Sequence, residues 1–326
     1  MASGRRTNLA LALLLLGALF AGFLSFAIGS DWRVHPSVVH GVVGLAILVL
    51  SPWKSLVIKR GLERPRSGRT WSLMFLFVVL VAIGSGLVHS ADVTRSVAGL
   101  TLMQIHVGAG LAVLVLGIAH YRRHPQRPRG PDLDRRGFVR LATIGGVASV
   151  FWWGWEGLAG ASRRFTGSHE RGSYDPGGYP VTSWINDVPP TLEADTWRVV
   201  VGERDLSLDE LAAMVDGDIE ATIDCTGGWF STQKWEGVRL DRLVDLGEWR
   251  SVEVASATGY SRRFPIRDLD RLWLAVAVGG EQLSVGHGFP ARIVAPDRRG
   301  FWWVKWVVSI RPSMTPWWVQ SPFPLT

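Results

Sequence analysis

The only cysteine of the 326-residue chain, Cys225, lies in the stretch Ile223-Asp224-Cys225-Thr226-Gly227-Gly228-Trp229. A lone cysteine cannot form an internal disulfide, so it is either a small buried hydrophobic residue or a soft metal ligand. The residues before Cys225 are typical of the end of a strand, and Thr226-Gly227-Gly228 is typical of a tight turn that leaves backbone room beside the sulfur. A thiolate in such a place is suited to binding a metal, with glycine amides facing an anionic cofactor. An inert thiol in the core is the alternative.

Two histidines form a second candidate site. The stretch His40-Gly-Val-Val-Gly-Leu-Ala-Ile-Leu-Val-Leu aligns with His106-Val-Gly-Ala-Gly-Leu-Ala-Val-Leu-Val-Leu, which indicates an internal repeat. Two copies of a helical hairpin predict a four-helix bundle with His40 and His106 at equivalent heights. Ionisable side chains at membrane depth are costly and usually have a partner. Two neutral imidazoles that face each other can supply both axial ligands of a haem; the alternative is helix-end histidines bonded to backbone or lipid headgroups.

With this repeat, residues 1–121 resemble the small four-helix b-type cytochromes that serve as membrane subunits of respiratory oxidoreductases. The resemblance implies a haem b between His40 and His106, in the outer half of their helices. His120 follows His106 on the same predicted helix, but the equivalent position of the first hairpin holds Lys54, which is not a usual haem ligand. A second, inner haem is therefore not expected.

Charge is distributed unevenly along the chain. Residues 1–165 carry 19 Lys and Arg against 6 Asp and Glu, a net charge of +13, whereas residues 166–326 carry 16 against 22, a net charge of −6. The basic residues of the first part lie between long apolar runs, which is the pattern of a membrane protein with positive loops. No module of stacked aromatic and basic residues is evident, which argues against a nucleic-acid partner.

Four apolar runs of about 18 to 23 residues are each long enough to cross a ~30 Å hydrocarbon core as a helix. They span roughly residues 9–28, 38–58, 71–88 and 97–119. Most basic loop residues lie on one side of these runs, and the opposite loops hold only Arg33 and Arg95. The positive-inside rule predicts a multi-pass protein in the lipid of a bacterial cytoplasmic membrane, with a cytoplasmic N-terminus.

An export signal is predicted in the middle of the chain. Arg135, Arg136 and Phe138 precede a modest apolar run from Leu141 to about Ala161. This pattern resembles a twin-arginine signal, which implies that the twin-arginine translocase exports a domain already folded and loaded with cofactor. An ordinary positive-inside anchor is the alternative. Both interpretations predict a cytoplasmic linker and a fifth membrane-spanning helix within residues 122–165, and place residues 166–326 outside the cytoplasm.

Residues 166–326 are predicted to form an α+β domain. The Gly-, Ser- and Pro-rich stretch 162–196 is expected to be a linker laid over the domain surface. Ser207 and Glu210 form a capping-box pattern at the start of a helix. A short helix is expected at residues 240–246, and strands are expected at residues 197–201, 252–257, 272–278, 291–295 and 302–310.

Four short motifs follow one another in this domain. They are Cys225-Thr-Gly-Gly-Trp, Trp235-Glu-Gly-Val-Arg-Leu, Gly286-His-Gly-Phe-Pro-Ala-Arg and Val304-Lys-Trp. In this order they resemble the molybdopterin domain of the sulfite oxidase family, over about residues 176–312. The resemblance implies a Mo-molybdopterin cofactor and an oxidoreductase that transfers an oxygen atom and two electrons. It assigns to Cys225 the role of the protein thiolate on molybdenum.

The resemblance also assigns cofactor contacts. Arg292 and Lys305 match the residues that bind the pterin phosphate, and a bidentate guanidinium with a point-charge amine suits a phosphate. Further cofactor contacts are implied for His287, Trp303, Val304 and, as a weaker match, Ser256. Tyr260 and Trp229 are candidates for the wall of the catalytic pocket beside Cys225, with packing as the alternative.

The sequence departs from the family pattern after the cysteine. Eukaryotic sulfite oxidases and plant nitrate reductases carry arginines there that help to hold an oxyanion, whereas the first arginine after Cys225 is Arg239. A less cationic pocket is therefore predicted, which argues against sulfite or nitrate as the substrate. The domain is nearer the compact bacterial type, some members of which resemble methionine sulfoxide reductases with a separate haem-containing membrane partner.

Together these features predict a multi-domain membrane oxidoreductase, with an all-α transmembrane bundle of four helices and a fifth anchor helix, followed by an α+β molybdopterin domain. Molybdenum on Cys225 would exchange electrons through a haem b with the quinone pool or an extracytoplasmic cytochrome. One alternative is an anchored molybdoenzyme without haem that uses a soluble electron carrier. The other is a non-catalytic binding or scaffold protein that keeps the fold.

Overall fold

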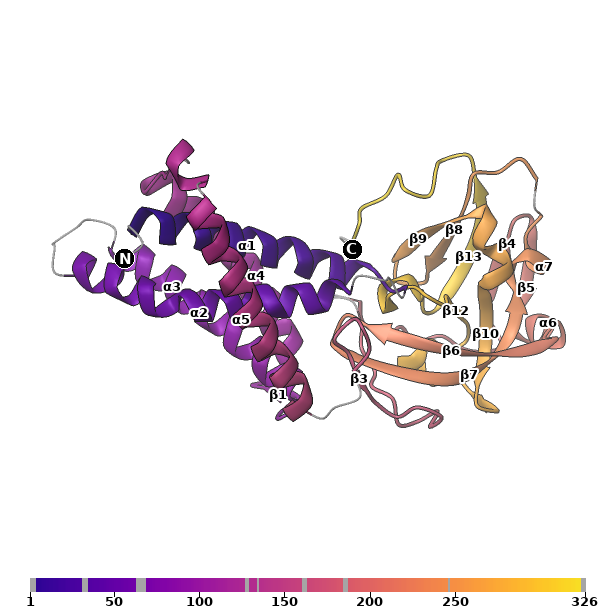
Figure 1. Cartoon of the computed structure of the whole chain (residues 1–326). Coiled ribbons are helices and arrows are strands. Elements are labelled where there is room, and N and C mark those ends of the chain that lie inside the picture. The colour runs from indigo at the N-terminus through magenta and orange to yellow at the C-terminus, as the bar shows by residue number, and fades with distance from the viewer. Residues whose placement is uncertain are drawn as a thin grey trace. The chain divides into compact units, whose positions relative to one another are not determined.

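The computed structural model describes the chain except for residues 1–3, 31–34, 63–68, 127–128, 134, 160–162, 184–186, 246 and 324–326. The chain divides into two compact units. The first comprises Met1–Phe26 and Trp32–Gly167, and the second comprises Ala27–Asp31 and Ser168–Thr326. The first is helical and the second is a sheet-rich α+β domain (Figure 1).

Within the described residues, five α-helices make up most of the first unit. They are α1 (Gly4–Ala27), α2 (Pro36–Leu62), α3 (Arg69–Ser90), α4 (Leu102–Arg123) and α5 (Arg135–Ala159). A hairpin of β1 (Ser96–Val97) and β2 (Leu100–Thr101) precedes α4, and the 3-10 helix η1 (Gly130–Leu133) precedes α5. This hairpin makes α4 begin later than the predicted residue 97, at Leu102, where Thr101 and Gln104 form a reciprocal capping box.

Four of these helices, α1 to α4, are long and apolar enough to cross a membrane. The fifth, α5, forms at the expected place but is not among the candidate spans found in the described residues. Its glycines and tryptophans, together with Glu156, lower the hydropathy of its apolar run. The prediction of a fifth membrane-spanning helix is therefore not confirmed. Instead α5 packs on α2, where Gly41 leaves room for Trp152, because a Cβ at Gly41 would lie 2.1 Å from the indole ring.

The second unit contains two sheets. One has the strand order β11-β10-β7-β3, with β12 also paired to β10 and β6 to β7, and the other has the order β5-β4-β13-β8-β9. The strands are β3 (His169–Glu170), β4 (Arg198–Val201), β5 (Arg204–Ser207), β6 (Gly217–Cys225), β7 (Trp229–Arg239), β8 (Ser251–Ser256), β9 (Ser261–Pro265), β10 (Trp273–Val278), β11 (Glu281–Gln282), β12 (Arg292–Val294) and β13 (Val307–Ser313). The short helices are α6 (Leu208–Ala213), α7 (Leu240–Leu243), η2 (Ile266–Arg271), η3 (Val285–His287) and η4 (Gly300–Trp302).

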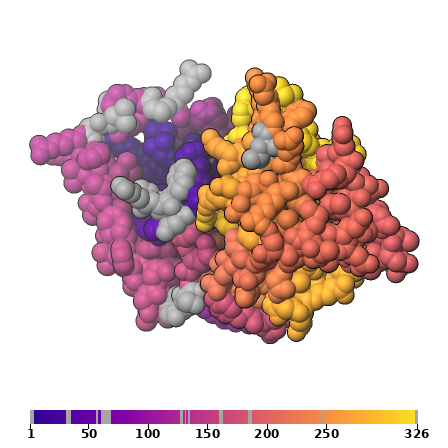
Figure 2. Space-filling view, turned by 90° about the vertical axis from the view of Figure 1, so that its right-hand side faces the viewer, coloured from indigo at the N-terminus to yellow at the C-terminus, as the bar shows by residue number. Residues whose placement is uncertain are grey.

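Alternating apolar side chains build the core between the sheets. Val199 and Val201 of β4 are buried, as are Val252 and Val254 of β8. Full burial of such a side chain contributes about 1.5–3 kcal/mol. Because β4 pairs in parallel with β13, segments far apart in the sequence lie side by side. On the face of this unit seen in Figure 2, the orange and yellow parts of the chain, beyond about residue 250, lie next to the red-orange part near residue 200.

The stretch 162–196 does more than cover the domain surface. Its strand β3 pairs in parallel with β7, His169 lying opposite Trp229. The Gly172 carbonyl accepts hydrogen bonds from side chains of β7, and the Tyr179 ring is buried. The prediction of a surface linker is therefore wrong for this part, because Gly- and Ser-rich composition does not reveal backbone pairing with a distant strand.

Candidate active site

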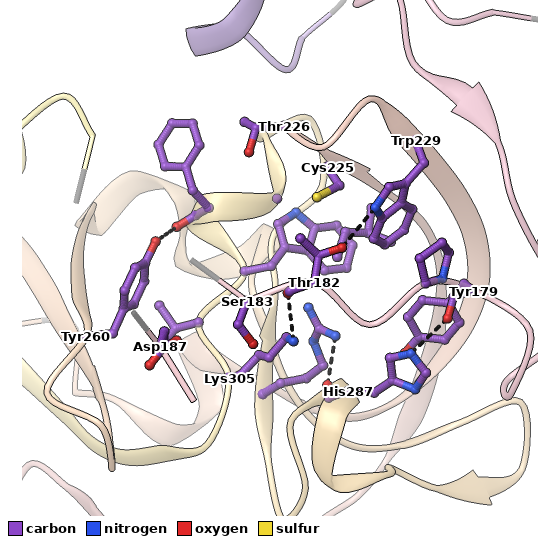
Figure 3. A pocket seen from close by; sticks show the side chains of 17 residues that line it. Tyr179, Thr182, Ser183, Asp187, Cys225, Thr226, Trp229, Tyr260, His287 and Lys305 are labelled. Carbon is purple, nitrogen blue, oxygen red and sulfur yellow. Dashed lines mark hydrogen bonds between the residues drawn. The ribbon is translucent and has the colours of Figure 1, made fainter. Parts of the chain in front are cut away.

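The β6–β7 hairpin positions Cys225. Cys225 is the last residue of β6 and pairs with Trp229 across a turn in which Gly228 has a φ of 88°. The Gly227 N–H donates a hydrogen bond to Cys225 Sγ at 3.3 Å, and the Gly228 N–H donates to the Cys225 carbonyl at 3.1 Å. The predicted strand end and tight turn are confirmed, whereas the prediction of glycine amides that face an anionic cofactor is wrong, because the Gly227 and Gly228 amides both bond to Cys225 itself. The sulfur points into a pocket (Figure 3).

A buried ion pair holds the backbone behind Cys225. Asp224 and Arg299 are each 2% exposed and form a salt bridge, and Asp224 Oδ1 also accepts a hydrogen bond from Ser168 Oγ at 2.7 Å. Arg299 Nη2 donates to the Cys225 carbonyl at 3.2 Å. Gly300 permits this close approach, because a Cβ there would lie 3.1 Å from the Cys225 Cα. Sequence reasoning missed this pair, for which an acidic residue next to the lone cysteine was the only local signal.

The pocket encloses about 620 Å³, part of which is open to solvent. It brings together all but one of the residues that the sequence assigned to this site. These are Cys225, Trp229, Tyr260, His287, Arg292, Trp303, Val304 and Lys305. The exception, Ser256, lies outside the lining, where its hydroxyl bonds to that of Thr258 at 2.9 Å.

Two cations, buried Arg292 and half-buried Lys305, line the pocket. Arg292 is 1% exposed and donates from Nη1 to the His287 carbonyl at 2.8 Å, while its Nε and Nη2 have no hydrogen-bond partner among the described residues. Lys305 Nζ donates to the carbonyls of Thr182 at 2.9 Å and Gly286 at 2.6 Å. Burial, with the Arg292 charge, lowers the pKa of Lys305 to about 7. Buried cations with unused donors fit an anionic group such as a phosphate.

Gly288 brings these two cations together. Its φ of 113° is a conformation that favours glycine, and a Cβ there would lie 3.0 Å from the Arg292 Cβ and 3.3 Å from the Lys305 Cβ. The glycine at position 288 of the Gly286-His-Gly-Phe-Pro-Ala-Arg motif therefore allows Arg292 and Lys305 to pack closely against the turn.

His287 uses both ring nitrogens within the protein. Nδ1 lies 3.0 Å from Ser284 Oγ, and Nε2 lies 3.0 Å from the Tyr179 carbonyl. The ring stacks on Tyr179 at 3.8 Å between centroids. Burial, with the Arg292 charge, lowers the pKa of His287 to about 4, so the ring is neutral at neutral pH. Its carbonyl orients Arg292, and a direct contact of the ring with a cofactor stays a prediction.

The two aromatic candidates, Trp229 and Tyr260, line the pocket, and a hydrogen bond fixes each side chain. Trp229 Nε1 donates to Thr182 Oγ1 at 3.1 Å, and the Tyr260 hydroxyl donates to the Phe301 carbonyl. Burial raises the pKa of Tyr260. Each ring is therefore held in one orientation in the wall of the pocket.

Sequence reasoning missed the pocket residues of the 162–196 stretch. Tyr179, Thr182, Ser183 and Asp187 all line the pocket, and Figure 3 shows them around Cys225 and Lys305. The one available signal was the aromatic Tyr179 within a Gly- and Pro-rich segment.

Known proteins match this second unit. Residues 185–318 match the family model of the oxidoreductase molybdopterin binding domain. Human mitochondrial sulfite oxidase is 30% identical over 178 aligned residues, which cover 41% of this chain and 33% of that protein. The second unit contains a molybdopterin-binding oxidoreductase domain of the sulfite oxidase family.

Other relatives of this molybdopterin domain include proteins from rat and a bacterium. Rat mitochondrial sulfite oxidase is 30% identical over 170 residues, covering 39% of this chain and 31% of that protein. The uncharacterized oxidoreductase YuiH of Bacillus subtilis is 28% identical over 137 residues, covering 38% of this chain and 69% of its own. The chain spans about a third of the length of the mitochondrial relatives. A solved structure, the sulfane dehydrogenase SoxCD from Paracoccus pantotrophus, aligns at a TM-score of 0.36 and 23% identity over 39% of this chain and 40% of that chain.

The chemistry of the pocket fits a molybdopterin cofactor. A soft thiolate suits molybdenum, and metal binding requires the thiol to lose its proton. Burial raises the pKa of the Cys225 thiol, while the Gly227 N–H and the Arg299 charge act in the opposite direction. Arg292, which has unused donors, lines the same pocket as Cys225. The domain therefore offers a metal ligand and an anion site in one cavity.

The helical unit brings His40 and His106 together, as the repeat predicts. Their Nε2 atoms lie 3.2 Å apart. The Nδ1 atom of His40 lies 2.8 Å from the Ala18 carbonyl, and that of His106 lies 2.7 Å from the Ala82 carbonyl. A glycine follows each alanine by one helical turn, at positions 22 and 86, and a Cβ at either would lie 3.0 Å from the histidine ring. The two hairpins thus hold their histidines in the same way.

The two hairpins also carry equivalent polar pairs away from His40 and His106. Lys54 Nζ donates to Asn8 Oδ1 at 2.8 Å, and Ser72 Oγ lies 3.4 Å from His120 Nδ1. The described residues contain no group of three or more His, Cys, Asp and Glu side chains that could hold a metal ion. The Nε2 atoms of His40 and His106 are within hydrogen-bond distance of each other, and a role of the pair as haem ligands stays a prediction.

Proposed function

We propose that this protein is a membrane-bound, molybdopterin-dependent oxidoreductase in which Cys225 binds molybdenum. The observation that carries the proposal is that Cys225 lines a pocket together with Arg292, two of whose guanidinium nitrogens have no hydrogen-bond partner among the described residues. When bound, the cofactor supplies two-electron oxygen-atom transfer. Arg292 and Lys305 hold its phosphate, because a guanidinium fork and an ammonium point charge together satisfy phosphate oxygens.

The remaining pocket residues support this chemistry. The Gly227 N–H and the Arg299 charge stabilise the Cys225 thiolate. Trp229 and Tyr260 line the pocket and are only 8% and 6% exposed, so they form a rigid, largely apolar part of its wall.

The membrane part of the proposal is supported by four apolar helices and by the basic loops between them. The helices anchor the protein in the bacterial cytoplasmic membrane, with the N-terminus in the cytoplasm and the molybdopterin domain outside. Arg135 and Arg136 begin α5 and suit recognition by the twin-arginine translocase. Export of a folded domain is consistent with an unpaired cysteine and a cofactor inserted before export.

A second candidate function, electron transfer through a haem b, is favoured by the facing Nε2 atoms of His40 and His106. Each Nδ1 lies against a backbone carbonyl, which orients Nε2 toward the other histidine, as a pair of axial ligands would require. Electrons from the quinone pool or an extracytoplasmic cytochrome would pass through this site. The experiment below distinguishes this proposal from two alternatives. One is an anchored molybdoenzyme with a soluble carrier, and the other is a non-catalytic binding or scaffold protein.

The test is elemental analysis and a reduced-minus-oxidised optical spectrum of the full chain purified in detergent. We expect close to one molybdenum and one b-type haem per chain, with molybdenum lost in Cys225→Ala and retained in Ser256→Ala, which alters a residue outside the pocket. Molybdenum without haem would support the carrier-dependent enzyme. Equal metal content in Cys225→Ala and the parent protein would contradict the assignment of Cys225.

A further inference from the structure

The ion pair of Asp224 and Arg299 lies behind the thiol of Cys225 and outside the pocket. Both side chains are 2% exposed, and in the described part of the chain neither lines the pocket, whereas the neighbouring Cys225 does. The backbones of the two residues also meet in a parallel bridge, which joins the end of β6 to the residue that precedes η4. The pair therefore contacts the chain that carries the thiol and not the space of the pocket.

Ser168 completes this buried arrangement. It is fully buried, and its hydroxyl donates to Asp224 Oδ1 at 2.7 Å. Arg299 bonds to two neighbouring residues, from Nη1 to the Asp224 carboxylate and from Nη2 to the Cys225 carbonyl at 3.2 Å. Three segments that are far apart in the chain thus fix the orientation of one carboxylate and one guanidinium.

Both charges act on the Cys225 sulfur, and they act in opposite directions. The Arg299 charge favours the thiolate, and the Asp224 charge disfavours it. Because both side chains are buried, dissolved salt screens their fields much less than it screens the fields of exposed charges. The electrostatic potential at the sulfur therefore depends on the balance between these two charges.

Stability alone does not explain a buried ion pair at this place. The removal of two charges from water offsets much of their mutual attraction, and well-packed apolar residues of similar volume are often at least as stabilising. What an ion pair provides, and an apolar pair does not, is a fixed electric field. This field acts beside the residue to which the metal is assigned, since Asp224 directly precedes Cys225.

We propose that the Asp224–Arg299 pair, oriented by Ser168, sets the reduction potential of the metal centre that Cys225 binds. The inference rests on the proposed function, in which that metal is molybdenum. The three residues are positioning residues, since they act through Cys225 and through the field at its sulfur. Reduction adds an electron to the metal centre, so a nearby positive charge favours reduction and raises the potential, whereas a nearby negative charge lowers it.

The experiment is a redox titration of the molybdenum-loaded full chain in detergent, with dithionite as the reductant, ferricyanide as the oxidant and mediator dyes. Electron paramagnetic resonance follows the one-electron-reduced molybdenum through its unpaired electron. The variants are Asp224→Asn, Arg299→Gln and the double variant with both changes.

Asp297→Asn is the matched control for these variants. Asp297 lies in the same loop as Arg299 and loses the same charge as Asp224, but its side chain is 56% exposed. Its φ of 61° is a conformation that asparagine tolerates. The control therefore changes the charge of the loop without changing the buried pair.

We expect Asp224→Asn to raise the midpoint potential of molybdenum, because arginine keeps its charge and Arg299 is then uncompensated. Arg299→Gln should lower the potential, because the Asp224 charge is left alone, and the double variant should lie between the two, near wild type. These shifts should persist at high salt, since the charges are buried. Asp297→Asn should keep the wild-type potential at physiological salt, because water and ions screen an exposed charge.

A purely structural clamp predicts another pattern, in which both single variants shift the potential in the same direction. Shifts of the same sign, or an unchanged potential in either single variant, would overturn the inference. If the single variants bind no molybdenum, Ser168→Ala decides, because it keeps both charges and removes one hydrogen bond from the Asp224 carboxylate. A potential below that of wild type in Ser168→Ala would support the inference, and an unchanged potential would overturn it.

Failure of the proposed function gives a different result from failure of this inference. Wild type without molybdenum, from cells that make the cofactor, would overturn the proposed function and this inference with it. Molybdenum-loaded wild type and variants of equal potential would overturn this inference alone.

Discussion

The pocket around Cys225 and the pair of His40 and His106 are assembled in different ways. Cys225 sits at the end of one strand, and the cations opposite it come from segments much later in the chain. The two histidines instead occupy matching places in two similar hairpins, each against an alanine carbonyl. A site built from unlike parts can give each group a separate task, whereas a site built from a repeat presents the same ligand twice. The molybdopterin pocket therefore suits substrate selection, and the histidine pair suits a symmetric cofactor.

The largest effect is expected when one of the two histidines is removed. His40→Ala or His106→Ala should abolish a b-type band, because the histidines supply both axial ligands, while molybdenum content stays unchanged. The measurement is the reduced-minus-oxidised spectrum with elemental analysis. His124→Ala, at the end of α4, is the control and should keep the band. A full band in both His40→Ala and His106→Ala would disprove the haem assignment.

Loss of the buried Asp224–Arg299 ion pair behind Cys225 should lower the free energy of unfolding more than loss of an exposed ion pair. Arg299→Gln leaves Asp224 buried without its cation, so we expect a loss of about 3–5 kcal/mol in the free energy of unfolding of the second unit. Arg271→Gln breaks the exposed pair with Asp297 and should cost about 1 kcal/mol or less. Thermal or denaturant unfolding of the purified chain measures both. Equal losses for the two variants would show that the buried pair does not support the hairpin.

Substitution of a glycine by alanine should cost more stability where other atoms crowd the glycine. Gly288 and Gly259 both have positive φ, at 113° and 89°, but only Gly288 is crowded by other atoms. Gly259→Ala should cost about 1 kcal/mol from backbone strain, whereas Gly288→Ala should cost about 2–3 kcal/mol and lower molybdenum content, because Arg292 and Lys305 must move apart. Unfolding curves and elemental analysis test this. Identical behaviour would mean that crowding at Gly288 is relieved without cost.

His287 should give the molybdopterin domain a modest dependence of stability on pH. Its folded pKa of about 4 lies below the ordinary histidine value of 6.5, so between these values the unfolded chain binds more protons than the folded chain. Stability should therefore fall, on the order of 2 kcal/mol, as pH drops from about 6.5 toward 4, and His287→Gln should reduce that fall. Unfolding of wild type and variant at several pH values measures the difference. An unchanged pH profile in the variant would assign the effect to other groups.

Several elements could be predicted from the sequence because their signals are local. The capping box of Ser207 and Glu210, the strand that ends at Cys225 and the apolar runs of α1 to α4 all depend on residues close together in the chain. Strand β3 could not be predicted in this way, because its pairing with β7 depends on backbone groups and not on side-chain pattern. The fifth span stays a prediction, since length and basic flanks suggested a membrane anchor where the tryptophans and glycines of α5 reduce hydropathy.

The sequence by itself determined that the protein has one thiol, a repeated histidine and an uneven charge distribution. These features set the kinds of chemistry that the protein can perform. Only the tertiary structure decided that Asp224 would pair with Arg299 behind the thiol, that Arg292 would retain unused donors, and that Asp187 would enter the pocket from a segment expected to cover the surface. The physical reason is that ligand chemistry belongs to single side chains, whereas charge balance and hydrogen-bond satisfaction in a buried site depend on groups that the fold brings together from distant positions.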